Sequence, residues 1–215
     1  MSKKLTSSLT PPTSSLLPHP SSLTPPTSSL TQTPSQTIGP FFYDGLIAEV
    51  HAPKPALAKQ GAFGQRIVIT GLVLDGDHAP VPDAMVEIWQ ADANGIYNHP
   101  ADPNHAKADA HFSGFGRSDT RNNGHFYFET VKPGGVQGQA PHVNVRVFSR
   151  GMLVHAITRL YFFDEPANAG DPVLSMVPAE RRSTLIAKLQ TNTGLPTYEL
   201  NLVLQGAGET IFFTP

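Results

Sequence analysis

Residues 71–90 read GLVLDGDHAPVPDAMVEIWQ, and this stretch decides the fold class. It joins an apolar run that begins at residue 67, through a turn with two prolines, to a second apolar run at 84–90. Short runs rich in Val, Ile and Leu are typical of buried strands. Proline has no backbone N–H, so Pro80 and Pro82 fit the edge or start of a strand rather than its centre. We therefore predict two strands joined by a turn.

Alternating patterns extend the β prediction along the chain. Phe126 and Phe128 share one face of residues 125–130, and the valines of 143–147 alternate with polar residues. The Asn123-Gly124 pair predicts a type I′ turn, because both central positions of that turn need positive φ. Further elements are predicted from spacing and helix-start signals: strands at 153–163, 198–205 and 209–213, and one helix at 178–190. Together they indicate an all-β sandwich or barrel with long loops and one short helix.

Residues 1–34 differ in composition from the rest of the chain. Ser, Thr, Pro and Leu supply 29 of these 34 positions, and the sequence SSLTPPTSSL occurs twice, at 7–16 and 21–30. The prolines block a helix, and isolated leucines bury too little surface to offset the entropy of ordering. The prolines also interrupt the apolar region that a secretion signal needs. We predict a disordered low-complexity tail at 1–34 and one folded domain at 35–215.

Composition excludes several classes of function. The chain has 215 residues and no Cys, which removes disulfides, thiolate metal sites and a cysteine nucleophile. A net charge of −2 argues against general affinity for nucleic acid or anionic membranes. No apolar run reaches the roughly 18 residues of a membrane-spanning helix. We expect a cytoplasmic protein in which any metal is held by His, carboxylate or Tyr.

Motifs of several common enzyme classes do not occur in the sequence. There is no phosphate-binding P-loop, no dinucleotide-binding glycine fingerprint, no H-E-x-x-H and no G-x-S-x-G. Nucleotide chemistry, zinc-dependent proteolysis and α/β-hydrolase chemistry are therefore disfavoured. Four histidines in presumed loops are interpreted as solvated turn residues: His51, His78, His99 and His105.

The pattern of residues 71–90 and 119–134 resembles transthyretin-like and carboxypeptidase-regulatory-like modules, which specifies a fold better than a function. Five more segments make the resemblance specific: TIGPFF at 37–42, WQADANGIY at 89–97, HFSGFGR at 111–117, PHVNVRV at 141–147 and TRLYFF at 158–163. With these segments in order, residues 34–215 resemble the intradiol ring-cleaving dioxygenases. The resemblance implies their β-sandwich, with transthyretin-like (prealbumin-like) topology.

In that family two tyrosines and two histidines hold a ferric ion. The resemblance places the first tyrosine at Tyr97 and the first histidine at His142, but Val136 and Asn144 stand at the other two positions. Phenolate oxygens and imidazoles suit Fe(III), whereas an amide carbonyl is a poor ligand and valine is none. The resemblance therefore implies no metal and no catalytic residue in this chain alone, with Tyr97 and His142 as relict positions. We expect amide and cationic side chains, including Arg146, to fill the relict pocket.

These departures imply the iron-free chain of a hetero-oligomer, whose homologous beta chain binds Fe(III) in repeated alpha–beta pairs. In the family, a Thr-x-Gly-Pro segment of the iron-free chain walls the partner's substrate cavity, and here it is Thr37, Gly39 and Pro40. Glycine allows close backbone approach, and proline stiffens a loop. Arg159 is a further candidate for this cavity wall, because a guanidinium favours an aromatic acid's carboxylate. An interface or surface salt bridge is the alternative role for Arg159.

The implied reaction inserts both atoms of O2 into 3,4-dihydroxybenzoate and cleaves the ring between its hydroxylated carbons, giving 3-carboxy-cis,cis-muconate. Fe(III) of the partner acts as a Lewis acid, so the isolated chain is expected to be inactive. A non-catalytic β-sandwich binding module explains the strands but leaves 37–42, 89–97 and 141–145 without a role. A homomeric catechol-cleaving enzyme is inconsistent with Val136 and Asn144.

Overall fold

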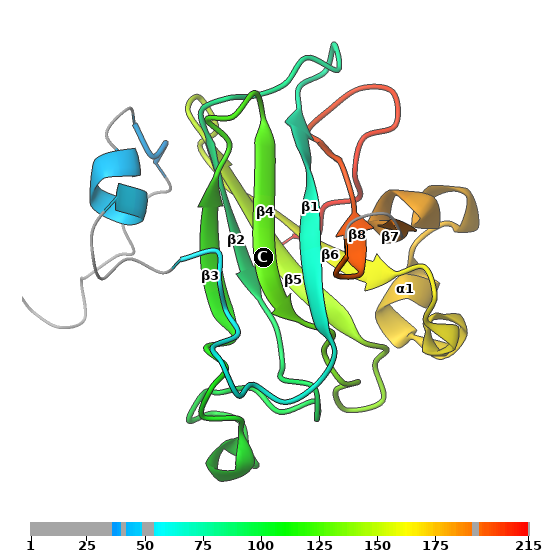
Figure 1. The fold of residues 1–215 in the computed structure, drawn as a ribbon. Coiled ribbons are helices and arrows are strands. Elements are labelled where there is room, and N and C mark those ends of the chain that lie inside the picture. Colours follow the sequence, from blue (N-terminus) through cyan, green and yellow to red (C-terminus); the bar gives the residue numbers. More distant parts are fainter. Residues whose placement is uncertain (1–35, 40–41, 49–53, 191–193, 215) are drawn as a thin grey trace, which may run out of the picture. The chain divides into compact units, whose positions relative to one another are not determined.

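The computed structural model describes residues 36–39, 42–48, 54–190 and 194–214. Strands dominate these residues, as Figure 1 shows. In chain order they are β1 (Arg66–Leu74), β2 (Ala84–Trp89), β3 (Phe115–Asp119), β4 (His125–Val131), β5 (His142–Ser149), β6 (Ala156–Phe162), β7 (Ile186–Gln190), β8 (Thr197–Glu199) and β9 (Leu202–Val203). The prediction of an all-β fold is confirmed.

Helical segments are short and lie in the connections. They are a π-helix at Tyr43–Ala48, 3₁₀-helices at His105–Lys107, Pro166–Gly170 and Ala179–Leu185, and the α-helix α1 (Pro172–Met176). Helix α1 begins at an Asp-Pro pair: the Asp171 carboxylate accepts a hydrogen bond from the Leu174 backbone N–H (2.7 Å), and Pro172 occupies the first helical position. None of the helices in the described ranges has the length and apolar character needed to cross a membrane.

The strands pair in the order β3-β2-β5-β6-β7-β8-β1-β4, with β9 beside β1. Figure 1 shows β1 and β4 lying across the layer formed by β2, β3 and β5. The core lies between these layers, where alternate residues of each strand point inward. On β5 these are Val143, Val145 and Val147, which pack with Ile67 and Ile69 of β1 in one buried cluster. The opposite face of β5 is therefore left for polar side chains.

The predicted type I′ turn is confirmed. Asn123 and Gly124 have φ of 49° and 82°, and the His125 N–H donates to the Asn122 carbonyl at 3.0 Å. The turn connects β3 and β4, but these strands pair with β2 and β1 respectively. The turn therefore carries the chain from one layer to the other and does not close a hairpin of two paired strands.

Several predicted boundaries are wrong. The helix predicted at 178–190 is a 3₁₀-helix over Ala179–Leu185 followed by β7, which is inserted between β6 and β8. Residues 209–213 form no strand; Phe213 makes one bridge to Ile157, with its N–H 2.7 Å from that carbonyl. The strand predicted at 198–205 is divided into β8 and β9. Pairing with distant strands sets these limits, and such pairing leaves little trace in local spacing.

Candidate functional site

A cavity of about 640 Å³ lies on the face of β2, β5 and β6 that is turned away from the core. The alternation along β5 sends His142, Asn144 and Arg146 to this face, as their sequence spacing predicted. Two loops, residues 97–103 and 136–139, complete the cavity. This cavity is called the relict pocket below, because it is lined by all four positions that the sequence resemblance matched to iron ligands: Tyr97, Val136, His142 and Asn144.

Tyr97 is held as a neutral phenol. The Asn144 Nδ2 donates to the Tyr97 hydroxyl oxygen (3.2 Å) and also to the Trp89 carbonyl (3.2 Å). Burial raises the pKa of Tyr97, which favours the protonated hydroxyl. The Tyr97 ring stacks on Trp89, with centroids 5.7 Å apart and planes 11° from parallel. The phenol thus has both a polar and an aromatic partner in this chain.

His142 is also satisfied within the chain. Its Nδ1 lies 2.8 Å from the Ala140 carbonyl oxygen, which can only accept, so Nδ1 carries the proton. Burial lowers the pKa of His142, and the nearby Arg159 guanidinium lowers it further. The ring is therefore neutral with its Nε2 unprotonated, and His142 is one of the residues that line the relict pocket.

These residues do not fit a ferric ion. An Fe(III)–tyrosine bond needs a phenolate, but Tyr97 is a partly buried phenol that receives an N–H from Asn144. Val136 offers no donor atom. In the part of the chain that the structure describes, no three His, Cys, Asp or Glu side chains gather where they could hold a metal. Amide and cationic side chains do enter the relict pocket, as predicted, but they do not fill it, since its volume is about 640 Å³.

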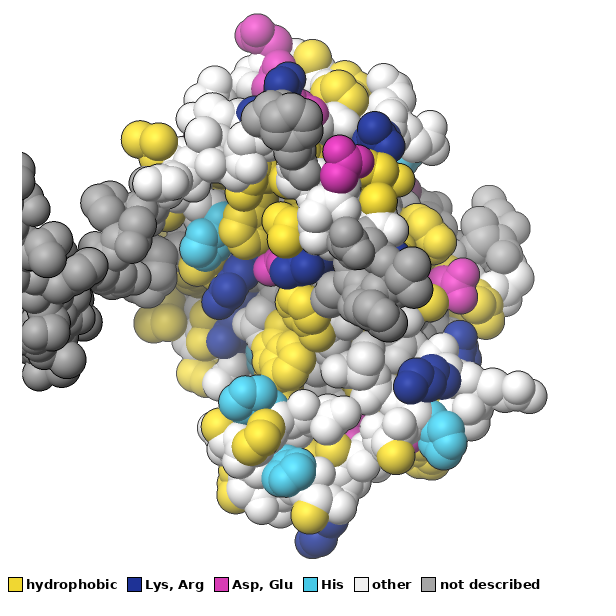
Figure 2. All heavy atoms as spheres, turned by 90° about the vertical axis from the view of Figure 1, so that its left-hand side faces the viewer, with side chains coloured by type: hydrophobic (Ala, Val, Ile, Leu, Met, Phe, Trp, Pro, Cys, Tyr) yellow, Lys and Arg dark blue, Asp and Glu magenta, His cyan; other side chains and the backbone are white. Residues whose placement is uncertain are grey.

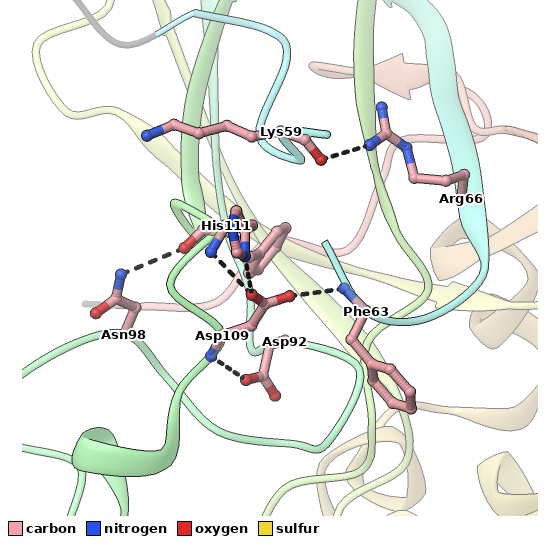
Figure 3. A network of polar contacts seen from close by, with 8 residues as sticks. Lys59, Phe63, Arg66, Asp92, Asn98, Asp109 and His111 are labelled. Atoms are coloured by element: carbon pink, nitrogen blue, oxygen red, sulfur yellow. Dashed lines mark hydrogen bonds and ion pairs between the residues drawn. The ribbon is translucent and has the colours of Figure 1, made fainter. Parts of the chain in front are cut away.

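Tyr97 lies in a loop that is held in place by hydrogen bonds to aspartate carboxylates. The Asp102 carboxylate accepts the Tyr97 backbone N–H at 2.9 Å. Further along, the Asp92 carboxylate accepts the Asp109 N–H (3.0 Å), and Asp109 accepts the Phe63 N–H (2.7 Å), as Figure 3 shows. Each acceptor satisfies a loop N–H that has no strand partner. The site loop is thereby fixed to the residues that precede β1.

Next to the loop at 136–139, Tyr161 and Asp171 form a buried, hydrogen-bonded pair. The Tyr161 hydroxyl donates to Asp171 Oδ1 (3.0 Å), and Asp171 Oδ2 accepts the Ala140 N–H (2.8 Å). Both side chains are fully buried. Burial raises the pKa of Tyr161 to about 12. This pair fixes the backbone beside the 136–139 loop.

Replacing Tyr161 with Phe is expected to change how stability depends on alkaline pH. An unfolded tyrosine loses its proton near pH 10, whereas folded Tyr161 keeps it to about pH 12, so the protein loses roughly 2–3 kcal/mol as pH rises between these values. Tyr161→Phe removes this loss, although it costs about 1 kcal/mol at neutral pH through the missing hydrogen bond. Urea unfolding from pH 8 to 11.5 measures both effects. Parallel declines in the two proteins would contradict the prediction.

The predicted cavity-wall residues are not brought together. The Thr37 hydroxyl accepts the Gly151 N–H at 3.0 Å, which places residues 36–39 at the β5–β6 turn, and Pro40 lies outside the described residues. Arg159 instead lines the relict pocket of its own chain and donates to the Gln139 side-chain oxygen at 2.7 Å. In the β5–β6 pairing Arg159 lies opposite Asn144, so it is several residues away from the β5–β6 turn at which Thr37 is placed. No salt bridge to Arg159 is formed within the described residues.

Sequence reasoning missed several residues of the site. Trp89, Gln139 and Asp171 were not singled out as site residues, although Asp171-Pro172 is a recognisable helix start. Of the four histidines interpreted as solvated, His78, His99 and His105 are exposed, while His51 lies outside the described residues. His99 nevertheless lines the relict pocket and makes an edge contact with the Trp89 ring.

Comparison with solved structures identifies the fold. An intradiol ring-cleavage dioxygenase from Tetranychus urticae gives a TM-score of 0.57 at 22% identity, over 83% of this chain and 98% of that one. Catechol 1,2-dioxygenase from Acinetobacter sp. ADP1 gives 0.54 at 19% identity, over 74% of this chain and 60% of that one. At these identities the likeness shows the fold, which is that of the ring-cleaving dioxygenases.

Sequence comparison then gives the family. The family described as Dioxygenase matches residues 38–206. The chain is 44% identical to the protocatechuate 3,4-dioxygenase alpha chain of Burkholderia cepacia, over 84% of this chain and 96% of that one. It is 33% identical to the beta chain of the same organism's enzyme, over 82% and 77%. The chain therefore belongs to the intradiol dioxygenase family, a family of oxidoreductases, as its motifs predicted. Nothing in these comparisons favours the non-catalytic binding module.

Proposed function

We propose that this chain is the alpha subunit of a protocatechuate 3,4-dioxygenase. It supports cleavage of 3,4-dihydroxybenzoate by O2 to 3-carboxy-cis,cis-muconate. The observation that carries the proposal is the 44% identity to an alpha chain over 96% of that chain's length, against 33% to the matching beta chain. Identity at this level along almost the whole length supports a shared role rather than a shared fold alone.

Iron belongs to the homologous beta chain in this proposal, and the two chains form repeated alpha–beta pairs. The support is chemical: Tyr97 is a partly buried phenol hydrogen-bonded to an amide, and valine stands at another ligand position. Bound in the partner, Fe(III) supplies Lewis-acid activation of the catecholate toward O2. This chain then provides interface area and cavity wall.

The cavity wall is proposed to come from the N-terminal segment with Thr37, Gly39 and Pro40. Thr37 is tied to the β5–β6 turn through Gly151, which gives the segment a fixed anchor. Gly39 has φ of 67° and open space around its Cα, which leaves room for close approach of another chain. Arg159 is assigned to the relict pocket instead, where its hydrogen bonds lie.

Two further proposals rest on the sequence alone. Residues 1–34 form a low-complexity tail that is separate from the domain at 35–215, because their composition cannot supply a core. The second proposal is a cytoplasmic location, because the prolines of residues 1–34 interrupt the apolar region that an export signal needs.

Expression with and without the candidate beta chain tests the proposal. The full chain alone should contain no stoichiometric iron, show no visible tyrosinate-to-iron absorption and take up no O2 with protocatechuate. Co-expression should yield a co-purifying complex with colour and activity. The matched control is the beta chain expressed alone, which shows what this chain adds. Iron, colour and activity from this chain by itself would overturn the proposal.

A further inference from the structure

The turn between β5 and β6 exposes apolar side chains. Residues 149–155 read SRGMLVH, whereas turns are usually built from Gly, Pro, Asn, Asp and Ser. Leu153 and Val154 are 66% and 52% exposed. Among the large hydrophobic residues that are exposed in the described part of the chain, they are the only two adjacent in sequence. A single exposed hydrophobic side chain needs no explanation, but a contiguous apolar surface marks contact with another molecule.

A groove of about 170 Å³ beside this turn extends the apolar surface. Its hydrophobic lining comes from the N-terminal segment, from the end of β5 and from the turn: Ile38, Phe148, Met152 and Leu153. These four residues and Val154 are called the turn patch below. Figure 2 shows hydrophobic side chains at the surface near the upper end of the face seen from the β3 side, the end at which the β5–β6 turn lies in Figure 1. Two segments that are distant in sequence therefore build one surface.

The turn that carries this surface is fixed from two sides. Arg150 Nε donates to the Asp83 carboxylate at 2.6 Å, and the Gly151 N–H donates to the Thr37 hydroxyl oxygen at 3.0 Å. Gly151 has φ of 86°, in the left-handed region that favours glycine. A surface that is already ordered loses little conformational entropy when another chain covers it. The turn patch is therefore preorganised for binding.

Ile38 indicates which molecule covers the turn patch. It lies between Thr37 and Gly39, in the segment at residues 37–40 that the proposed function assigns to the wall of the partner's substrate cavity. The hydrogen bond from Gly151 to Thr37 joins that wall segment directly to the turn. A chain that contacts the wall segment at Gly39 therefore also reaches Ile38 and the apolar residues beside it.

We infer that the turn patch is a docking contact for the homologous iron-binding chain, and that it holds the wall segment in place against that chain's cavity. This inference rests on the proposed function and adds a defined surface to it. Specific interfaces bury roughly 800 Å² on each partner, which so short a wall segment cannot supply by itself. The fully buried centre of an interface is apolar and poor in charged residues, as the turn patch is.

Affinity for the purified candidate beta chain tests the inference, with that chain immobilised and the full chain titrated over it. Leu153→Glu should raise the Kd roughly 10- to 100-fold, because it buries a carboxylate without a partner. Leu153→Met keeps an apolar side chain and should stay within about threefold of the parent. The matched control is Phe63→Glu, which introduces the same charge at a side chain that is 63% exposed, in the loop before β1. It should bind as the parent does.

Two further measurements separate docking from folding. Thermal melts of the isolated variants should match the parent, because substitutions at exposed positions change stability little. Hydrogen exchange of the parent chain with and without the beta chain should show slower exchange of the backbone amides at 150–155 in the complex. The amides at 60–65, around the control residue Phe63, should exchange at the same rate in both states.

The outcomes distinguish this inference from the proposed function. If the parent chains associate but Leu153→Glu binds as tightly as the parent, the inference is overturned and the proposed function stands. If the parent chains do not associate, both are overturned. If this chain associates with itself and Leu153→Glu abolishes only that self-association, the turn patch belongs to a second copy of the chain, which also overturns the inference.

Discussion

Replacing Asp171 with Ala should lower the free energy of unfolding by about 3–5 kcal/mol, the largest loss expected from a single polar side chain here. The carboxylate is fully buried and accepts three hydrogen bonds, from Leu174 N–H, Ala140 N–H and the Tyr161 hydroxyl. Removing it leaves these donors buried without a partner and removes the cap of α1. Urea unfolding at pH 7 measures the loss, and the melting temperature should fall by roughly 10 °C.

Two controls separate the hydrogen bonds from the loss of a charge. Asp171→Asn keeps one acceptor oxygen and should lose less stability than Asp171→Ala. Asp77→Ala removes an exposed carboxylate and should change the free energy of unfolding by less than about 0.5 kcal/mol. If Asp171→Ala lowered the free energy of unfolding by less than about 1 kcal/mol, the three donors would have to be hydrogen-bonded to water in the variant. That result would contradict the role of Asp171 as their required acceptor.

The stability lost in Asp171→Ala should become smaller as the pH falls. Burial disfavours the charge of Asp171, but the N–H donors of Leu174 and Ala140 outweigh it and lower the pKa of the carboxyl. The contribution to stability is therefore complete above the unfolded pKa near 3.8 and is lost as pH falls below it. The difference between the parent and Asp171→Ala should narrow in acid accordingly.

Strands with an alternating or continuous apolar sequence could be predicted from the sequence alone. Alternation on β4 and β5, the apolar run of β1 and the Asn123-Gly124 turn all correspond to the structure. The pattern failed for β7, because Leu185, Ile186 and Leu189 lie at helical spacing and predicted a helix. There the parallel pairing of Tyr161 and Phe162 with Ile186 and Ala187 decides the conformation, and that pairing is set by tertiary contacts.

The candidate site was predictable where residues share one strand. His142, Asn144 and Arg146 reach the same face because a strand alternates with a period of two. The position of Arg159 could not be predicted, because its neighbours follow from the β5–β6 register, which pairs it with Asn144. Gln139 and Asp171 contribute through loops and a cap whose geometry depends on that same register.

Replacing Gly71 with Ala is the other substitution expected to cost much stability, about 3 kcal/mol. Gly71 lies within β1, in the stretch that predicted the fold. A Cβ there would lie 1.9 Å from the Leu200 carbonyl oxygen and 3.0 Å from the Phe126 ring. The first contact is with backbone, so the chain between β8 and β9 must move and strain the 3.0 Å bond from Leu200 N–H to the Thr70 carbonyl.

The matched control for Gly71→Ala is Gly170→Ala, because a Cβ at Gly170 meets no atom within 4 Å and its φ is not in the left-handed region. That substitution should be neutral or stabilise by up to about 1 kcal/mol through the unfolded chain. Urea unfolding of both variants measures their free energies of unfolding relative to the parent. Equal stability of the two would mean that β1 tolerates a methyl group and that the close approach of Leu200 does not set its position. A loss confined to Gly71→Ala would show that the close approach of the Leu200 carbonyl to β1 requires a glycine at position 71.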